Sequence, residues 1–289
     1  MMCAGNIAGS FIFADSSCRS FLLAAPLLMS LAPVNSAIRE CEILGFRFGD
    51  RGTHTSRTMM LDELHTTLAT VPPHAVRTRY VEAIVEDNCL GKPTSSTRVL
   101  SAQRLSELYA LDPDVPLFRL MRNLWGLDER GRPLLALLMA LARDPLLAAT
   151  APSVLGLKNG EEFARGPMRQ ALRNAVGTRL SDDTVDKVAR NAASSWSQAG
   201  HLTGRTFKVR RHVQPTFATV AMALLLAYTC GGRGEALLNS DWLKAIDCQP
   251  LRARELAIEA KRHGLIDLRM VSAVIEIDFD RMDPWKVRR

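Results

Sequence analysis

Aromatic residues are scarce in this chain of 289 residues: they make up 6% of it, against 47% for apolar residues as a whole. Alanine and leucine are abundant among the apolar residues, and both favour helix over strand. With a charged fraction of 23%, the composition excludes a disordered chain, a collagen-like chain and a multi-span membrane protein. We therefore predict a globular fold that is mainly α with small β-hairpins.

Cysteine pairs and metal-ligand spacings are also missing. The six cysteines are Cys3, Cys18, Cys41, Cys89, Cys230 and Cys248, and none of them forms a Cys-x-x-Cys pair. The six histidines are scattered along the chain. This pattern provides neither a disulfide framework nor a zinc site. We expect reduced thiols, a cytoplasmic protein, and no metal or other cofactor.

No catalytic signature is complete. The run Gly91-Lys92-Pro93-Thr94 resembles the end of a phosphate-binding loop, but Glu86 stands where its first glycine should be. Pro93 also replaces the serine or threonine of that loop. The chain has no Gly-x-Ser-x-Gly, His-Glu-x-x-His or Gly-x-Gly-x-x-Gly motif. These absences predict that the protein is not an enzyme.

No apolar run has the length that a membrane span requires, which is about 20 residues. Residues 21–34 form a run of 14 that Pro26 interrupts, and the runs 134–141 and 218–230 are shorter. We expect the last two to be buried core helices, and we expect no association with a membrane.

Residues 1–58 show no sustained periodicity. The run 21–34 weakly resembles a signal peptide, but no lysine or arginine precedes Arg19. Regular apolar spacing begins at Leu61, directly after Met59 and Met60. We therefore predict that residues 1–58 are a poorly structured extension, or that translation starts at Met59 or Met60.

The formal net charge of +7 is concentrated in one part of the chain. Residues 163–213 hold ten lysines and arginines but three acidic residues, whereas the other 27 basic and 27 acidic residues cancel. A local excess of positive charge favours an anionic partner. The alternative interpretation is a solvated helix face whose charge serves solubility.

Apolar spacing and turn residues divide the rest of the chain into four parts. They are a helix-turn-helix-like unit at 61–112, a helical core at 113–180, a helix with a basic wing at 181–214, and a winged-helix-like unit at 215–289. The helices are expected near 61–69, 74–86, 95–110, 115–125, 133–142, 145–155, 167–176, 181–199 and 250–263. Two of them, 181–199 and 250–263, are followed by glycine, leucine and a hairpin. The architecture expected is a helical bundle with winged-helix- or helix-turn-helix-like units.

The helix at 181–199 and the hairpin at 203–213 provide the leading candidate site. The helix places five polar residues on one surface, namely Lys187, Arg190, Asn191, Ser194 and Gln198. Arginine, asparagine and glutamine match base edges in the major groove, while lysine and serine suit phosphates. The hairpin adds four cations for the DNA backbone, namely Arg205, Lys208, Arg210 and Arg211. The sequence therefore predicts binding of double-stranded DNA, with a solvated helix and hairpin as the alternative.

A second candidate surface lies on the predicted helix 95–110. The apolar stripe of this helix is Val99, Ala102, Leu105, Leu108 and Tyr109. The opposite face includes Thr97, Arg98 and Arg104, which could also contact DNA. An ordinary exposed face is the other interpretation of these three residues.

Two short stretches resemble a known family. They consist of Val85-Glu86-Asp87-Asn88-Cys89-Leu90 with Lys92, Thr94, Ser95, Ser96, Thr97 and Arg104-Leu105, and of Ala199-Gly200-His201-Leu202 with the strand after it. They are similar to parts of the BrxA family, small accessory proteins of bacteriophage-exclusion (BREX) defence systems. The resemblance covers roughly 61–112 and 181–214. It implies a mostly helical protein with a winged helix that binds DNA without catalysis. The implied partners are a methyltransferase, an ATPase and a phosphatase-like protein.

The leading hypothesis is thus a non-enzymatic DNA-binding accessory component of a prokaryotic antiviral system. The first alternative is an interaction adaptor in such a complex, which would dock through the apolar middle and the C-terminal hairpin. The second is a stand-alone winged-helix transcription regulator, which would require a dimer.

Overall fold

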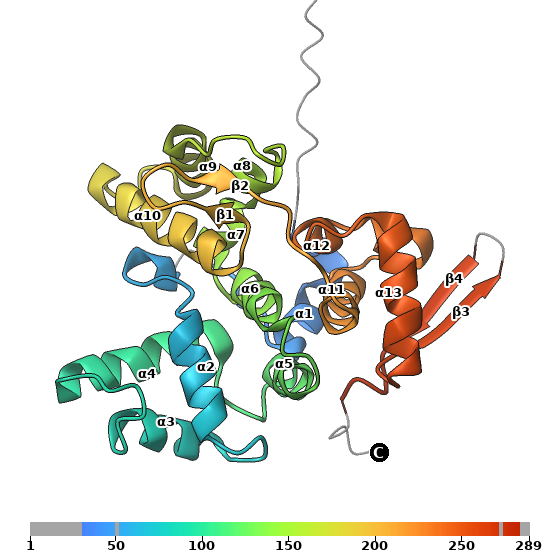
Figure 1. Cartoon of the computed structure of the whole chain (residues 1–289), viewed down its shortest axis with the longest axis horizontal. Helices are drawn as coiled ribbons and strands as arrows, with labels where there is room; N and C mark the ends of the chain where they lie inside the picture. The colour runs from blue at the N-terminus through green and yellow to red at the C-terminus, as the bar shows by residue number, and fades with distance from the viewer. Residues whose placement is uncertain (1–30, 50–51, 272–273, 284–289) are drawn as a thin grey trace, which may run out of the picture.

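The computed structural model describes residues 31–49, 52–271 and 274–283. Thirteen α-helices and two antiparallel two-stranded hairpins make up its regular structure apart from short 3₁₀ turns. The prediction of a mainly α fold with small β-hairpins is confirmed. Figure 1 shows three peripheral groups of elements around the central helices α5, α6 and α11.

The centre of the molecule is the apolar middle of the sequence. The three helices are α5 (Pro116–Leu127), α6 (Arg132–Arg143) and α11 (Phe217–Thr229). Every residue of α6 from Leu134 to Arg143 is buried, as is every residue of α11 from Ala218 to Ala227. This burial explains why both helices lack a polar face. No single helix in the described ranges has the length and apolarity to cross a bilayer, although α11 joined to the bent segment 234–244 passes that test by length and composition.

The first peripheral group is the unit predicted at 61–112. Its helices are α2 (Leu61–Thr70), α3 (Arg77–Val85) and α4 (Ser95–Tyr109). On α4, Ala102, Leu105, Leu108 and Tyr109 are buried as expected, but Val99 is 51% exposed. The predicted stripe of α4 is therefore correct except at its N-terminal end.

The second group contains the helix predicted at 181–199 and the hairpin predicted at 203–213. Its elements are α7 (Pro145–Ala149), α8 (Ala151–Leu155), α9 (Arg165–Val176), α10 (Asp182–Gln198), β1 (Leu202–Thr203) and β2 (Val209–Arg210). The register pairs Leu202 with Arg210 and Thr203 with Val209. Glu162 adds an isolated antiparallel bridge to Val209 on the other edge of β2. A short extended segment therefore precedes α9 and joins the hairpin that follows α10.

The third group follows α11. Its elements are η3 (Gly234–Asn239), α12 (Asp241–Lys244), α13 (Pro250–Arg262), β3 (Asp267–Val271) and β4 (Val274–Asp278). The strands pair antiparallel, with Asp267 opposite Asp278. The expected order of helix, glycine and hairpin is present here, since Gly264 separates α13 from β3.

The N-terminal region differs from its prediction. Residues 35–44 form η1 (Asn35–Ala37) and α1 (Ile38–Leu44), and a further turn, η2, spans Thr53–Thr55. Cys41 and His54 are fully buried. The expectation of a poorly structured extension at 1–58 is therefore wrong for 31–49 and 52–58, and the rest of it lies outside the described residues. These segments have no helical periodicity because they pack through isolated buried residues and main-chain hydrogen bonds.

Candidate nucleic-acid interface

Helix α10 is fixed by a cap at its start and by a wide buried face. Ser181 Oγ accepts a hydrogen bond from the Thr184 amide at 3.3 Å, as expected of an N-cap residue. The predicted buried stripe is confirmed at Val185, Val188 and Trp196. The Trp196 indole N–H donates to Thr150 Oγ1 at 2.9 Å. These contacts determine which side of α10 faces outward.

One outward line of α10 carries cations. Lys187, Arg190, Ser194 and Ser197 follow one another at steps of three, four and three, so they lie along one side of the helix. Lys187 and Arg190 are exposed, and within the described ranges neither forms an ion pair. Lys208 Nζ donates to Ser197 Oγ at 2.6 Å. The line of positive charge therefore continues from the helix onto the hairpin.

Two of the predicted base-reading residues have their amide groups hydrogen-bonded within the protein. Asn191 Nδ2 donates to the His54 carbonyl at 2.8 Å. Gln198 Nε2 donates to Thr58 Oγ1 at 3.1 Å, and Gln198 Oε1 accepts from the Leu61 amide at 3.2 Å. Both side chains thus hold residues 54–61 against α10. Both side chains are half-buried, and these amide groups contact the segment 54–61 instead of standing free beside Lys187 and Arg190.

Arg210 is the clearest correction to the predicted wing. Its side chain is 1% exposed, so it cannot reach a DNA phosphate. Arg210 Nη2 lies 2.5 Å from Asp247 Oδ1, and Nε donates to the Val154 carbonyl at 3.1 Å. The guanidinium also donates to the carbonyl of Arg211. Simple alternation of polar and apolar residues would place Arg210 outward. Arg210 instead points inward, because the nearly buried carboxylate of Asp247 compensates its charge.

The other two hairpin arginines remain available. Arg205 and Arg211 are exposed, and neither has an ion-pair partner in the part of the chain that the structure describes. Phe207 between them is 71% exposed. Lys187, Arg190 and Ser194 lie on the outward line of α10, Lys208 is joined to that line through Ser197, and Arg205 and Arg211 are exposed elsewhere on the same hairpin. We call these five cations the basic row.

The second predicted surface, on α4, has its polar groups engaged. Thr97 forms a capping box with Thr94. Arg104 pairs with Glu107 at 2.7 Å. Arg98 is half-buried, and its Nε is enclosed without a hydrogen-bond partner. These three residues serve the start and the packing of α4 rather than an open binding face.

A buried polar chain joins residues that the sequence analysis did not connect. His54 Nδ1 lies 2.8 Å from Asp144 Oδ2, and His54 Nε2 lies 2.8 Å from Ser195 Oγ. The order of groups matches a serine–histidine–aspartate triad. However, the exposed fractions of His54, Asp144 and Ser195 are 0%, 1% and 0%. Ser195 Oγ also accepts from the Met59 amide at 2.8 Å and donates to the Asn191 carbonyl at 2.9 Å. An enclosed hydroxyl with all its hydrogen bonds made is a packing element, and no substrate carbonyl can reach it.

The ionised carboxylate of Asp144 stabilises this buried cluster of hydrogen bonds. Burial alone would raise its pKa, but the His54 side chain and the main-chain amides of Leu147 and His54 hold that pKa below its ordinary value. Gly52 lies directly against the carboxylate, since a Cβ at this position would come within 2.1 Å of Asp144 Oδ1. No sequence signal could identify this cluster, because His54 and Ser195 are 141 positions apart.

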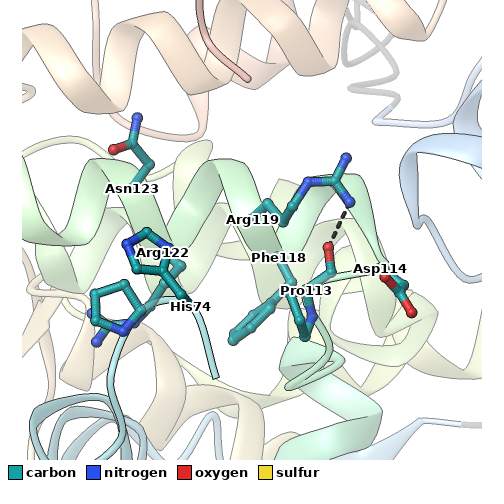
Figure 2. Close-up of a pocket in the computed structure, with 8 residues that line it drawn as sticks. His74, Pro113, Asp114, Phe118, Arg119, Arg122 and Asn123 are labelled. Atoms are coloured by element: carbon teal, nitrogen blue, oxygen red, sulfur yellow. Dashed lines mark hydrogen bonds between the residues drawn. The ribbon is translucent and has the colours of Figure 1, made fainter. Parts of the chain in front are cut away.

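A pocket of about 560 Å³ opens beside α5. It is lined by Pro73, His74, Pro113, Asp114, Phe118, Arg119, Arg122 and Asn123 (Figure 2). Arg119 donates to the Pro113 carbonyl at 2.5 Å and pairs with Asp283 at 2.7 Å. Arg122 donates to the carbonyls of Leu68 and Val71 at 2.7 and 3.0 Å. Both guanidiniums are therefore engaged in contacts within the protein. The exposed charged group at the pocket is the carboxylate of Asp114.

Across residues 31–49, 52–271 and 274–283, no group of three or more histidine, cysteine, aspartate or glutamate side chains is placed to hold a metal ion. No family model and no curated protein matches the chain.

Proposed function

We propose that this protein binds double-stranded DNA without catalysing a reaction, through the basic row on α10 and its hairpin. One observation carries the proposal. Five cations lie on a helix and on the hairpin that follows it, and the 2.6 Å contact between Lys208 and Ser197 joins the two elements. Phosphates are the ligands expected for such a surface, because each exposed cation can displace a condensed counterion from the duplex.

The order of elements supports this proposal. The bridging segment at Glu162 precedes α9, α10 and the β1–β2 hairpin, and it pairs with the second strand of that hairpin. Helix, strand, helix, helix and hairpin is the order of a winged helix, in which the last helix and the wing contact DNA. We therefore assign residues 145–211 to a winged-helix unit and α10 to its recognition helix.

The corrected site alters the expected mode of binding. The amide groups of Asn191 and Gln198 hydrogen-bond to residues 54–61, so they are not free to read adenine. Arg190 and Ser194 remain as the polar groups at the middle of α10. Contacts to phosphates dominate such an interface, and we expect salt-dependent binding with little preference for sequence.

Paired charge reversals test the proposal. One variant combines Lys187→Glu with Arg190→Glu, and the second combines Arg205→Glu with Arg211→Glu. The control combines Arg252→Glu with Arg262→Glu on α13, which changes the charge by the same amount. Electrophoretic mobility shifts at several salt concentrations measure the result. Each reversal pair in the basic row should reduce the slope of log K against log salt by about 2. Undiminished retention of both variants, or an equal loss in the control, refutes the proposal.

The cellular setting rests on the resemblance to the BrxA family. We propose that the protein works in the cytoplasm as an accessory of a phage-exclusion system, beside a methyltransferase, an ATPase and a phosphatase-like protein. Affinity purification of the full chain from its host, followed by mass spectrometry, tests this setting. Recovery of none of those three classes contradicts it, whatever the outcome of the DNA-binding assay.

An adaptor role is the second candidate, and the C-terminal group is the surface we propose for it. The apolar middle is buried in α6 and α11, so it offers no docking surface. Helix α13 exposes Leu251 at 72%, and two of its arginines pair with acids, in Arg252–Glu255 at 2.7 Å and Arg254–Glu235 at 3.0 Å. Such a mixed surface suits a protein partner better than a polyanion. An adaptor would show negligible duplex binding at moderate salt in the same assay.

A further inference from the structure

The tip of the β1–β2 hairpin exposes an aromatic ring in a tight turn. Phe207 is 71% exposed, although burial of a phenylalanine side chain stabilises a folded protein. Gly204 begins the turn with a φ of +106°, and a Cβ there would come within 2.0 Å of the Phe207 carbonyl oxygen. This glycine therefore lets the chain reverse closely enough to present Phe207 at the end of the hairpin.

The charges around Phe207 are of one sign along the chain. No acidic residue occurs between Lys187 and Glu235, whereas Arg205, Lys208 and Arg211 flank the ring on both sides. The nearest acids across the sheet, Glu161 and Glu162, lie beside Val209 and Arg210 at the base of the hairpin. An exposed apolar ring that cations flank along the chain complements a polyanion that has an apolar interior.

We infer that Phe207 is a wedge for the minor groove of duplex DNA, placed between two base pairs while Arg205 lies in the groove. This inference rests on the proposed function. Apolar side chains that enter base steps from the minor groove unstack them and bend the duplex, and arginine favours the narrow minor groove of A·T-rich sequences. The minor groove is about 6 Å wide, so side chains of the tip enter it rather than the hairpin backbone.

The rest of the basic row positions this tip. Lys208 Nζ contacts Ser197 Oγ at 2.6 Å. Lys208 directly follows Phe207 in the chain, and Ser197 lies three residues after Ser194 on α10. A duplex that lies along Lys187 and Arg190 therefore meets the hairpin at the C-terminal end of the helix. The wedge supplies a preference for deformable A·T-rich steps at an interface whose other contacts are to phosphates.

The test uses the full chain and short duplexes that carry 2-aminopurine at a central TA step, with a G·C-rich duplex for comparison. Unstacking of the reporter raises its fluorescence. The wild type should raise the fluorescence and prefer the A·T-rich duplex. Phe207→Ala should abolish the rise and weaken binding by about 5- to 160-fold, the loss expected when the stacking of one base on an aromatic ring is removed. Phe207→Trp should retain the rise. Leu251→Ala, which truncates a side chain that is 72% exposed on α13, is the matched control and should change nothing.

The outcomes separate the wedge from DNA binding itself. If the wild type does not retain either duplex, the proposed function fails. If the wild type binds through the basic row but the reporter stays stacked, or if Phe207→Ala binds as the wild type does, the wedge is refuted and DNA binding stands. A loss of the same size in Leu251→Ala also refutes the wedge. Because Phe207 is exposed, thermal unfolding of Phe207→Ala should match that of the wild type, so misfolding cannot imitate the result.

Discussion

Arg210 and Asp247 form an ion pair of 2.5 Å between the hairpin and the turn that precedes α13. Asp247 adopts a left-handed conformation, with φ of 53°, and its second carboxylate oxygen accepts from the Val213 amide at 2.9 Å. The side chains of Arg210 and Asp247 are 1% and 11% exposed. The pair therefore joins the second and third groups of elements.

Removing one partner of this pair should be costly. Asp247→Ala leaves the Arg210 guanidinium enclosed without its carboxylate, and we expect it to lower the free energy of unfolding by about 3–5 kcal/mol. Urea denaturation followed by circular dichroism measures this. Arg211→Ala, at the neighbouring exposed position, should change stability by less than about 0.5 kcal/mol. Equal stability of the two variants would show that the pair is not closed in solution.

The burial of Arg210 shows what a local sequence pattern cannot predict. Alternation of Phe207 and Val209 with Lys208 and Arg210 predicted cations on the outer face, yet Arg210 is buried and Phe207 is exposed. The deciding partner, Asp247, is 37 positions away, so no local pattern contains it. Helices behave differently, because their own apolar period determines them. Helix α9, expected at 167–176, spans Arg165–Val176, and α10, expected at 181–199, spans Asp182–Gln198.

His201 should make stability depend on pH. Burial, partly offset by the charge of Asp247, lowers the pKa of His201 from 6.5 to about 4. Below pH 6.5 the unfolded chain takes up a proton at this position that the folded protein does not accept until about pH 4. The free energy of unfolding therefore falls as the pH drops through this window. The full loss is about 3 kcal/mol, at about 1.4 kcal/mol per pKa unit.

Denaturation curves at pH 7 and pH 5 test this, with two histidines that flank the hairpin as a pair of variants. His201→Asn should lose most of the difference between the two pH values, whatever its stability at pH 7. His212→Asn removes an exposed histidine and should keep the wild-type difference. An unchanged pH dependence in His201→Asn would mean that other groups titrate in this range.

Gly52 should tolerate no side chain. Its backbone φ is −141°, which any residue can adopt, so the objection is steric. A methyl group there would overlap the Asp144 carboxylate, at 2.1 Å from Oδ1, and would displace the group that His54 contacts. We expect Gly52→Ala to lower the free energy of unfolding by about 1–3 kcal/mol.

Gly126→Ala is the matched control for Gly52→Ala. Gly126 lies in α5 with open space around the added methyl group. Alanine should stabilise the protein there by about 0.5–1 kcal/mol because it favours helix. Thermal unfolding of the two variants should therefore shift in opposite directions. A stable Gly52→Ala would show that residues 52–58 do not rest on Asp144 in solution.

The candidate site, like the hairpin, could be predicted only in part, because some of the partners of its residues are distant in the sequence. Helical spacing correctly places Lys187 and Arg190 on one exposed line. It also placed Asn191 and Gln198 beside them, and nothing local to α10 shows that residues 54–61 cover that flank. The hydrogen bonds concerned span 137 and 140 positions. Long-range hydrogen bonds of this kind leave no periodic trace in the sequence.

Substitutions of Asn191 and Gln198 should therefore affect stability and not duplex affinity, whereas substitution of Arg190 should do the reverse. Asn191→Ala and Gln198→Ala each remove hydrogen bonds to the segment 54–61, and each should lower the free energy of unfolding by about 1 kcal/mol. Because both amide groups are engaged within the protein, duplex affinity should stay within about twofold. Arg190→Ala removes an exposed cation, so it should weaken duplex binding while stability stays within about 0.5 kcal/mol. Urea denaturation and mobility shift on the same three variants measure both quantities. A loss of duplex affinity in Asn191→Ala without a loss of stability would restore the base-reading role for which its position on the helix first suggested it.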